Sequence, residues 1–186
     1  FFGDGTGNSG KNWNGLGNIV ESGNTVGGID SSAVGNDWWR SYEENTAGAL
    51  TLLQMATAYN SVSVGNDHPD VILTTQTLFE KYESLLQPQQ RFTDSKTAEA
   101  GFQNLTFKGI PLVWGENVAS GTVTFVNSNY LNLYVHDQAS FAFTGFESLL
   151  SNYQLGYVGA VLTLCELVET KPKTGVKVTG LTPVSI

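Results

Sequence analysis

The stretch that decides the fold is Asp70-Val-Ile-Leu-Thr-Thr-Gln-Thr-Leu-Phe-Glu-Lys-Tyr-Glu-Ser-Leu-Leu86. The apolar residues 71–73 predict a short strand, and Thr74 or Thr75 is placed to cap a helix that follows it. Within that helix, the apolar side chains recur at spacings that put them on one face: Leu78, Phe79, Tyr82, Leu85 and Leu86. The stretch therefore predicts a β-strand followed by an amphipathic helix, and neither element indicates a chemical activity.

The composition is that of a globular protein. The chain has 186 residues, 40% of them apolar, which suits one domain or two small lobes on a shared core. It carries 17 acidic and 9 basic residues, a net charge of −8. Sequence-specific nucleic-acid-binding proteins cluster Lys and Arg, and this sequence has no such cluster. The composition therefore argues against that class of function.

Export and membrane insertion are not indicated. No stretch approaches the roughly 18 apolar residues that a membrane span needs, and the N-terminus lacks the basic and apolar regions of a signal peptide. The sequence begins Phe1-Phe2 without an initiator Met, so we interpret it as a processed or truncated form.

A long helix is predicted upstream, from about Thr46 to Val64. Apolar residues recur there at helical spacing, and Gly65 and Pro69 end the pattern. We expect its Leu50, Leu53 and Met55 side to be buried against a strand over residues 157–168. On this expectation, Leu53→Asp would cost several kcal/mol, on the order of the whole stability of a small domain.

Several strands are predicted downstream by β-branched and aromatic residues. They cover residues 107–114, 122–126 and 130–135. The later run over residues 157–168 is almost continuously apolar, which predicts a strand with both faces covered.

Motifs that could carry chemistry are incomplete. Gly5-Thr-Gly-Asn-Ser-Gly-Lys-Asn12 nearly matches a phosphate-binding loop, but Asn12 stands where the metal-binding hydroxyl should be. His68 and His136 each lack a second His or Cys at ligand spacing. We therefore expect no tight nucleotide binding and no zinc site.

Other reactive residue types have ordinary structural explanations. Cys165 lies in an apolar run without a basic neighbour, as a buried cysteine would. Glu43-Glu44 and the Glu80/Glu83 pair fit solvated faces better than paired catalytic carboxylates. Trp38-Trp39 could stack on a sugar or a partner, although packing against the long helix is the simpler explanation.

A set of segments, taken in order, resembles one family. They are Gly3-Asp-Gly-Thr-Gly7, Gly15-Leu16 with Gly27-Gly-Ile-Asp30, the long helix, Pro69-Asp70 before a strand ending in Thr-Thr, Gln89-Gln-Arg-Phe92, Phe107-Lys-Gly-Ile-Pro-Leu-Val113, and Leu131–His136. Their order and spacing resemble the major capsid proteins of tailed bacteriophages, of the Hong Kong 97 type. The resemblance covers essentially the whole chain.

The resemblance implies an α+β fold of the Hong Kong 97 type. Its parts would be a long spine helix over 46–64, a peripheral sheet and an axial α/β domain. Residues 1–69 would belong to the peripheral domain, 70–150 to the axial domain, and 151–186 to the return into the peripheral domain and the C-terminal tail.

The resemblance also implies a function and partners. The protein would be a major capsid subunit that self-assembles into an icosahedral shell around double-stranded DNA, and its net negative charge would let it hold DNA without binding it tightly. Its partners would be other copies, in hexamers and pentamers, together with scaffold, maturation protease, portal and decoration proteins. Packaged DNA would be contacted without sequence specificity, and no membrane would be involved.

The same resemblance places the protein in the virion, after assembly in the host bacterial cytoplasm. The family has no catalytic residues to carry over. We therefore expect no enzyme activity and no cofactor, and we assign no catalytic, cofactor-binding or metal-ligating residue.

Family members carry an N-terminal arm and a long extended hairpin ahead of the Gly-Asp-Gly-Thr-Gly segment, and this sequence has neither. The resemblance therefore implies that the chain is the C-terminal portion of a subunit. We expect the complete protein to form shells or rings of five or six, and this portion alone to remain a monomer or small oligomer.

Other classes of function stay open. A secreted or surface β-rich module, binding carbohydrate or acting as an adhesin, is suggested by Trp13, Trp38, Trp39 and Trp114 and by the low charge density. The long helix and the strand–helix unit argue against it. A hydrolase is disfavoured because the chain lacks a G-x-S-x-G nucleophile motif.

Overall fold

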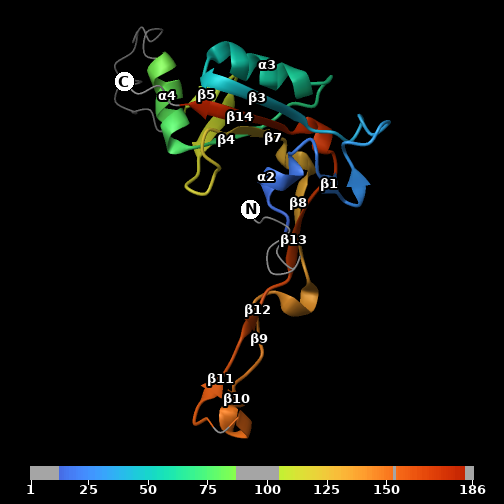
Figure 1. Cartoon of the computed structure of the whole chain (residues 1–186), viewed down its shortest axis with the longest axis vertical. Coiled ribbons are helices and arrows are strands. Elements are labelled where there is room, and N and C mark those ends of the chain that lie inside the picture. The colour runs from blue at the N-terminus through green and yellow to red at the C-terminus, as the bar shows by residue number, and fades with distance from the viewer. Residues whose placement is uncertain (1–12, 87–104, 153, 183–186) are drawn as a thin grey trace.

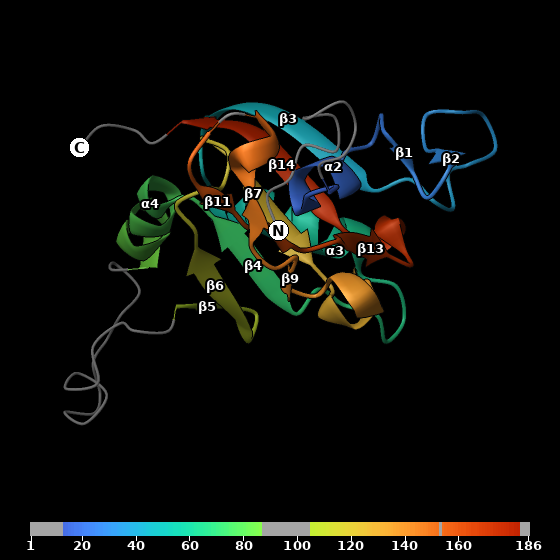
Figure 2. The same cartoon turned by 90° about the horizontal axis from the view of Figure 1, so that it is seen from below.

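The chain consists of a body and an arm (Figure 1). The computed structural model describes residues 13–86, 105–152 and 154–182. The body is a six-stranded sheet with helices packed on it, and the arm is a two-stranded ribbon that extends far from the body. Figure 2, a view along the ribbon, shows α4 and the β1–β2 hairpin at opposite ends of the body.

The sheet combines strands from distant parts of the chain. Its order is β3–β14–β7–β4–β6–β5. The pairs β14/β3 and β4/β6 are parallel, and β14/β7, β4/β7 and β5/β6 are antiparallel. The strands are β3 (Tyr42–Ala49), β4 (Val71–Thr74), β5 (Thr106–Phe107), β6 (Ile110–Trp114), β7 (Val123–Val126) and β14 (Val176–Thr182).

The strand and helix expected over residues 70–86 are confirmed as β4 and α4 (Gln76–Leu86). The helix buries Leu78 and Tyr82, and the Tyr82 hydroxyl donates a hydrogen bond to the Thr106 carbonyl at 2.8 Å. This contact ties α4 to the edge of the sheet. The expected strand over 122–126 is confirmed as β7, whereas residues 107–114 form β5 and β6 around a turn at Lys108-Gly109, both with positive φ.

The prediction of a long helix over residues 46–64 is wrong about where the helix begins and about what it packs against. Residues 46–49 belong to β3, and the helix α3 covers Leu52–Val62, 11 residues. The Thr51 side chain accepts a hydrogen bond from the Gln54 amide, while the Gln54 side chain accepts from the Thr51 amide. This capping box fixes the start of the helix, and parallel pairing with β14 keeps the preceding residues extended.

The buried side of α3 agrees with the expected one only in part. Met55, Ala58 and Val62 are buried, and the helix packs on β3 and β14 rather than on residues 157–168. Leu53 is 76% exposed. The expected burial of Leu53 is therefore wrong, whereas Leu50, just before the helix, and Met55 are buried as expected.

Leu53→Asp should consequently change the free energy of unfolding by no more than about 0.5 kcal/mol, because the new carboxylate stays in water. Urea unfolding of the variant and the wild type, followed by circular dichroism, measures the difference. A loss of several kcal/mol would contradict the exposed position of Leu53.

Two apolar cores lie on opposite faces of the sheet. Successive residues of a strand point to opposite faces, so Ile72 and Phe125 enter the core under α3 and α4, while Leu73 and Val126 face the second core. The second core contains Leu16, Ile19, Val20, Val126 and Leu167. Since Leu167 belongs to the ribbon, this core joins the ribbon to the body.

The ribbon is built from three antiparallel pairs. At its root, β8 (Leu131–Val135) pairs with β13 (Cys165–Glu169); further out, β9 (Ala142–Phe143) pairs with β12 (Val161–Leu162), and β10 (Glu147–Ser148) pairs with β11 (Tyr157–Val158) at the tip. The strand expected over 130–135 is thus confirmed as β8. The single strand expected over 157–168 is instead three short strands.

Short elements complete the described chain. They are α2 (Leu16–Ile19), β1 (Thr25–Val26), β2 (Ile29–Asp30), and the 3-10 turns η2 (Ser128–Tyr130), η3 (Asp137–Ala139), η4 (Leu149–Asn152) and η5 (Pro172–Thr174). The division at residues 69 and 150 stays a prediction, and the six-stranded sheet takes strands from all three of the expected segments.

Candidate subunit interface

The ribbon exposes an unusual amount of apolar surface. Phe141, Phe146 and Leu155 are 77%, 76% and 99% exposed. The other large apolar side chains exposed on the ribbon are Leu133, Tyr134, Val135, Phe143, Leu150, Tyr157, Val158, Val161, Leu162 and Leu164. Single exposed apolar residues are ordinary, but a contiguous series of this length is typical of an interaction surface.

The expectation that residues 157–168 are covered on both faces is wrong for the isolated chain. Tyr157, Val161 and Leu164 are 75%, 62% and 60% exposed. The apolar pattern reflects a requirement for burial, but beyond the root, where Leu167 packs on the body, the described chain covers the ribbon with nothing except its own paired strands (Figure 1). Any surface that covers the outer ribbon would therefore have to come from outside the described residues.

The edges of the ribbon are also open. Each of its three strand pairs is a two-stranded sheet, so both outer edges present unpaired backbone groups. Unpaired strand edges are templates for pairing with another chain. The ribbon therefore offers both apolar faces and backbone edges to a partner.

Polar contacts fix the ribbon at its root. The Tyr130 hydroxyl donates to both carboxylate oxygens of Asp67, at 2.9 and 3.0 Å, and the Lys171 ammonium pairs with the same carboxylate. These contacts lower the pKa of Asp67, the Lys171 hydrogen bond most and the Tyr130 hydrogen bond next. Nearby, Asp70 accepts a hydrogen bond from the Ser128 amide at 2.8 Å. At the root, the chain next to both strands of the ribbon is thus bonded to the loop before β4.

Replacing Asp67 with Asn should loosen this root. The neutral amide loses the ion pair with Lys171 and accepts more weakly from Tyr130. We expect faster hydrogen exchange of the backbone amides of Tyr130 and Thr170, measured by mass spectrometry, with little change in the body. Asp137→Asn, an exposed change further along the ribbon, is the matched control. Equal exchange in both variants would contradict a role for Asp67 in holding the ribbon.

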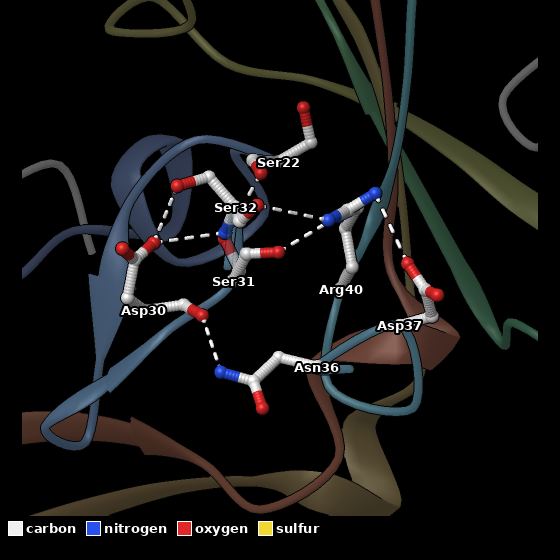
Figure 3. A network of polar contacts seen from close by, with 7 residues as sticks. All are labelled: Ser22, Asp30, Ser31, Ser32, Asn36, Asp37 and Arg40. Atoms are coloured by element: carbon white, nitrogen blue, oxygen red, sulfur yellow. Dashed lines mark hydrogen bonds and ion pairs between the residues drawn. The ribbon is translucent and has the colours of Figure 1, made fainter. Parts of the chain in front are cut away.

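A second polar network shapes the loop between β2 and β3 (Figure 3). Arg40 donates to the carbonyls of Ser31 and Ser32 at 2.7 and 3.3 Å, and its guanidinium forms an ion pair with Asp37 at 3.1 Å. The Asp30 carboxylate accepts from the amide and hydroxyl of Ser32, and these bonds lower the pKa of Asp30. The network holds this loop in one shape beside the ribbon root.

Glu169, the last residue of β13, is the most unusual charged group in the described chain. Its side chain is 1% exposed, and neither carboxylate oxygen has a hydrogen-bond partner. Burial raises the pKa of Glu169 to about 8. A buried carboxyl without a partner is costly, and nothing in the sequence pattern indicated this residue.

The residues considered for chemistry do not come together. Gly5–Asn12 lies outside the described residues. The His68 ring stacks on Tyr59 at 5.9 Å, and His136 lies in the ribbon, where its Nδ1 accepts a hydrogen bond from the Gln138 amide at 3.2 Å. Cys165 is half-buried in β13. Within residues 13–86, 105–152 and 154–182, no group of three or more His, Cys, Asp or Glu side chains is placed to hold a metal ion.

The paired tryptophans lie beside the β1–β2 hairpin. Their rings are 5.4 Å apart, and the Trp39 indole donates to the Val26 carbonyl at 3.2 Å. Trp38 is 57% exposed. The carboxylates Glu43 and Glu44 accept from the hydroxyls of Ser22 and Thr46. No helix among the described residues is long and apolar enough to cross a membrane.

Comparison with known proteins gives structural matches only. No known family and no curated protein matches the sequence. The cyanophage A-1(L) capsid asymmetric unit matches with a TM-score of 0.58 at 20% identity, over 86% of this chain and 57% of that chain. The holo-SrpI encapsulin complex from Synechococcus elongatus PCC 7942 matches with a TM-score of 0.53 at 12% identity, over 77% and 54% of the two chains.

These matches define a class of fold. The chain has a mixed α/β, capsid-like fold, which is shared by a phage capsid and an encapsulin. The capsid-like part of the resemblance is thereby confirmed, whereas its assignment to tailed phages stays a prediction. The chain spans a little more than half the length of each of these two structures' chains.

Proposed function

We propose that this chain is the shell-forming part of a capsid protein, specifically the major capsid protein of a tailed bacteriophage. Copies would assemble through hexamers and pentamers into an icosahedral shell that encloses double-stranded DNA. The single observation that carries the proposal is the outer part of the apolar ribbon, beyond its root, whose exposed side chains and strand edges are covered by nothing in the described chain.

The capsid-like fold supports this proposal, because a shell subunit must present surfaces that other copies cover. The net charge of −8 would limit tight binding to packaged DNA. We further propose that the protein acts as a structural component without enzyme activity. Scaffold, maturation protease, portal and decoration proteins would be its partners, and the virion its location after assembly in the host cytoplasm.

The test is assembly of the protein produced from its complete gene. A ribbon variant carries Phe141→Ser, Phe146→Ser and Leu155→Ser, and a body variant carries three similar changes at exposed positions: Val34→Ser, Leu53→Ser and Val64→Ser. Negative-stain microscopy and mass photometry should show closed shells for the wild type and the body variant. The ribbon variant should remain unassembled yet melt cooperatively.

Two outcomes would contradict the proposal. One is a wild-type protein that stays monomeric with scaffold and protease supplied, and the other is a ribbon variant that assembles as well as the wild type. Protection of co-packaged DNA from nuclease tests the enclosed DNA separately. A sugar titration followed by tryptophan fluorescence tests the alternative of a carbohydrate-binding module, for which exposed Trp38 and Trp114 are the reporters.

A further inference from the structure

We propose that a cleft at the root of the ribbon binds the cationic end of an alkyl chain, an ammonium or guanidinium group. In an assembled shell, a Lys or Arg side chain of a neighbouring copy would occupy this cleft. The identity of this occupant rests on the proposed function, whereas the binding chemistry rests on the cleft alone.

The cleft has a volume of about 440 Å³ and lies between the ribbon and the β1–β2 hairpin. One side is formed by β13 and the residue after it, positions 166–170. The other sides are formed by the hairpin, by Trp39 from the loop after it, and by Ile19 and Asn14 near α2. The cleft therefore lies between the root of the ribbon and residues 14–39, which precede the first strand of the sheet.

Two acidic residues, Glu166 and Glu169, belong to the lining of this cleft. Glu169 is 1% exposed, and both of its oxygens lack a partner. Glu166 accepts one hydrogen bond, from the Asn14 amide to its Oε1 at 3.1 Å. No Lys or Arg among the described residues forms an ion pair with either group, since the ion pairs involve Asp37, Asp67 and Glu21. The described part of the cleft thus holds two acidic residues and no Lys or Arg.

The walls suit the stem of such a cation. Val26, Ile29, Ile19 and Leu167 supply apolar surface, against which long cationic side chains lay their methylene groups. Trp39 also lines the cleft, and the face of an indole ring attracts a cation. A bare divalent metal fits less well, because no group of three ligating side chains is present in the described chain.

The cost of burying Glu169 explains why a cation would enter. In the single chain, burial holds the pKa of Glu169 at about 8, so the carboxyl remains protonated at neutral pH. A cation beside it favours the ionised form. Binding should therefore release a proton from Glu169 to the solvent, while the ammonium or guanidinium keeps its own charge.

The chain also supplies candidate donors for a neighbouring copy. Arg40, Lys171 and Lys177 are engaged in ion pairs, and Lys108 lies 4.3 Å from the centre of the Tyr59 ring. Among the remaining basic residues of the described chain, Lys81 and Lys173 form no ion pair within it. Both are available to reach the cleft of another copy.

The first experiment tests the binding chemistry on this chain. Calorimetric titration with n-butylammonium at pH 7 is compared with n-butanol, its neutral counterpart, at constant ionic strength. We expect butylammonium to bind at least tenfold more tightly than butanol. Titrations in two buffers of different ionisation enthalpy should show release of close to one proton.

Glu169→Gln should abolish both the preference for the cation and the proton release. Glu147→Gln, an exposed change in the ribbon, is the control and should preserve them. Equal binding of butylammonium and butanol, or unchanged binding by Glu169→Gln, would overturn the proposal. Cooperative melting of each variant excludes loss of binding through unfolding.

The second experiment tests the source of the cation in the protein made from its complete gene. Glu169→Gln should lower the yield of shells at least tenfold, and Lys81→Gln or Lys173→Gln should do the same. Shell formation unaffected by Glu169→Gln would overturn the neighbouring copy as the occupant, and a free amine would remain. A wild-type protein that forms no shells would instead contradict the proposed function, and the calorimetry would still decide the binding chemistry.

Discussion

Phe125→Ala should lower the free energy of unfolding by about 3–5 kcal/mol, a large share of the 5–15 kcal/mol that holds a typical domain together. Phe125 is 0% exposed and lies on β7, between β14 and β4 in the sheet. Its ring packs in the core under α3 and α4. Removing it leaves a cavity that the surrounding strands, fixed by pairing on both sides, cannot fill.

The ribbon offers a matched control for this change. Phe141→Ala removes the same atoms from a side chain that is 77% exposed, so the free energy of unfolding should change by no more than about 0.5 kcal/mol. Urea unfolding of both variants gives the two values. We expect the Phe141 variant to be defective in assembly and not in folding. A comparable loss of stability in both variants would contradict the division between a buried body and an uncovered ribbon.

The stability of the chain should fall as the pH rises through the range in which Glu169 titrates. In the unfolded chain this carboxyl has its ordinary pKa of 4.5, and in the folded chain burial raises the pKa to about 8. Below pH 4.5 both states are protonated, and Glu169 adds no pH-dependent penalty. Between pH 4.5 and 8 the unfolded state loses its proton first, so folding becomes less favourable.

The expected loss over this window amounts to as much as roughly 5 kcal/mol, since a tenfold change in proton affinity corresponds to about 1.4 kcal/mol. Asp30 and Asp67 contribute in a different range. Their pKa values are lowered below 3.8, so the stability that they supply is lost only as the pH falls below that value.

Glu169→Gln should remove most of this pH dependence. The variant should be more stable than the wild type above pH 8 and similar to it near pH 4.5, because its neutral amide needs no proton. Glu147→Gln, at an exposed position, should leave the profile unchanged. Urea midpoints measured at several pH values between about 4 and 9 provide the test. A wild-type profile that is flat over this range would show that Glu169 is solvated or paired.

Local elements were predictable where short-range forces decide them. The strand and helix of residues 70–86 follow from apolar spacing and from a capping residue, all within one short segment. The start of α3 was not predicted, because parallel pairing with β14, more than 100 positions later in the chain, keeps residues 46–49 extended. Helix periodicity alone contains no information about such a partner.

The sequence pattern that marks the candidate interface was recognised, but its burial was assigned to the wrong surface. The apolar run over 157–168 correctly signals burial, and the expectation assigned that burial to the chain's own sheet. In the structure Tyr157 and Val161 are exposed on an extended ribbon. An apolar pattern indicates that a surface avoids water, but it does not indicate whether the same chain or another chain covers that surface.

By itself, the sequence determined the strand–helix unit of residues 70–86, several strands of the sheet, and the capsid-like class of fold. Only the tertiary structure decided the packing of α3, the direction of the ribbon held by Asp67, and the burial of Glu169. The physical reason is the range of the forces. Capping, spacing and turn preference act between near neighbours, whereas strand partners and the solvation of a carboxyl depend on residues that meet only after folding.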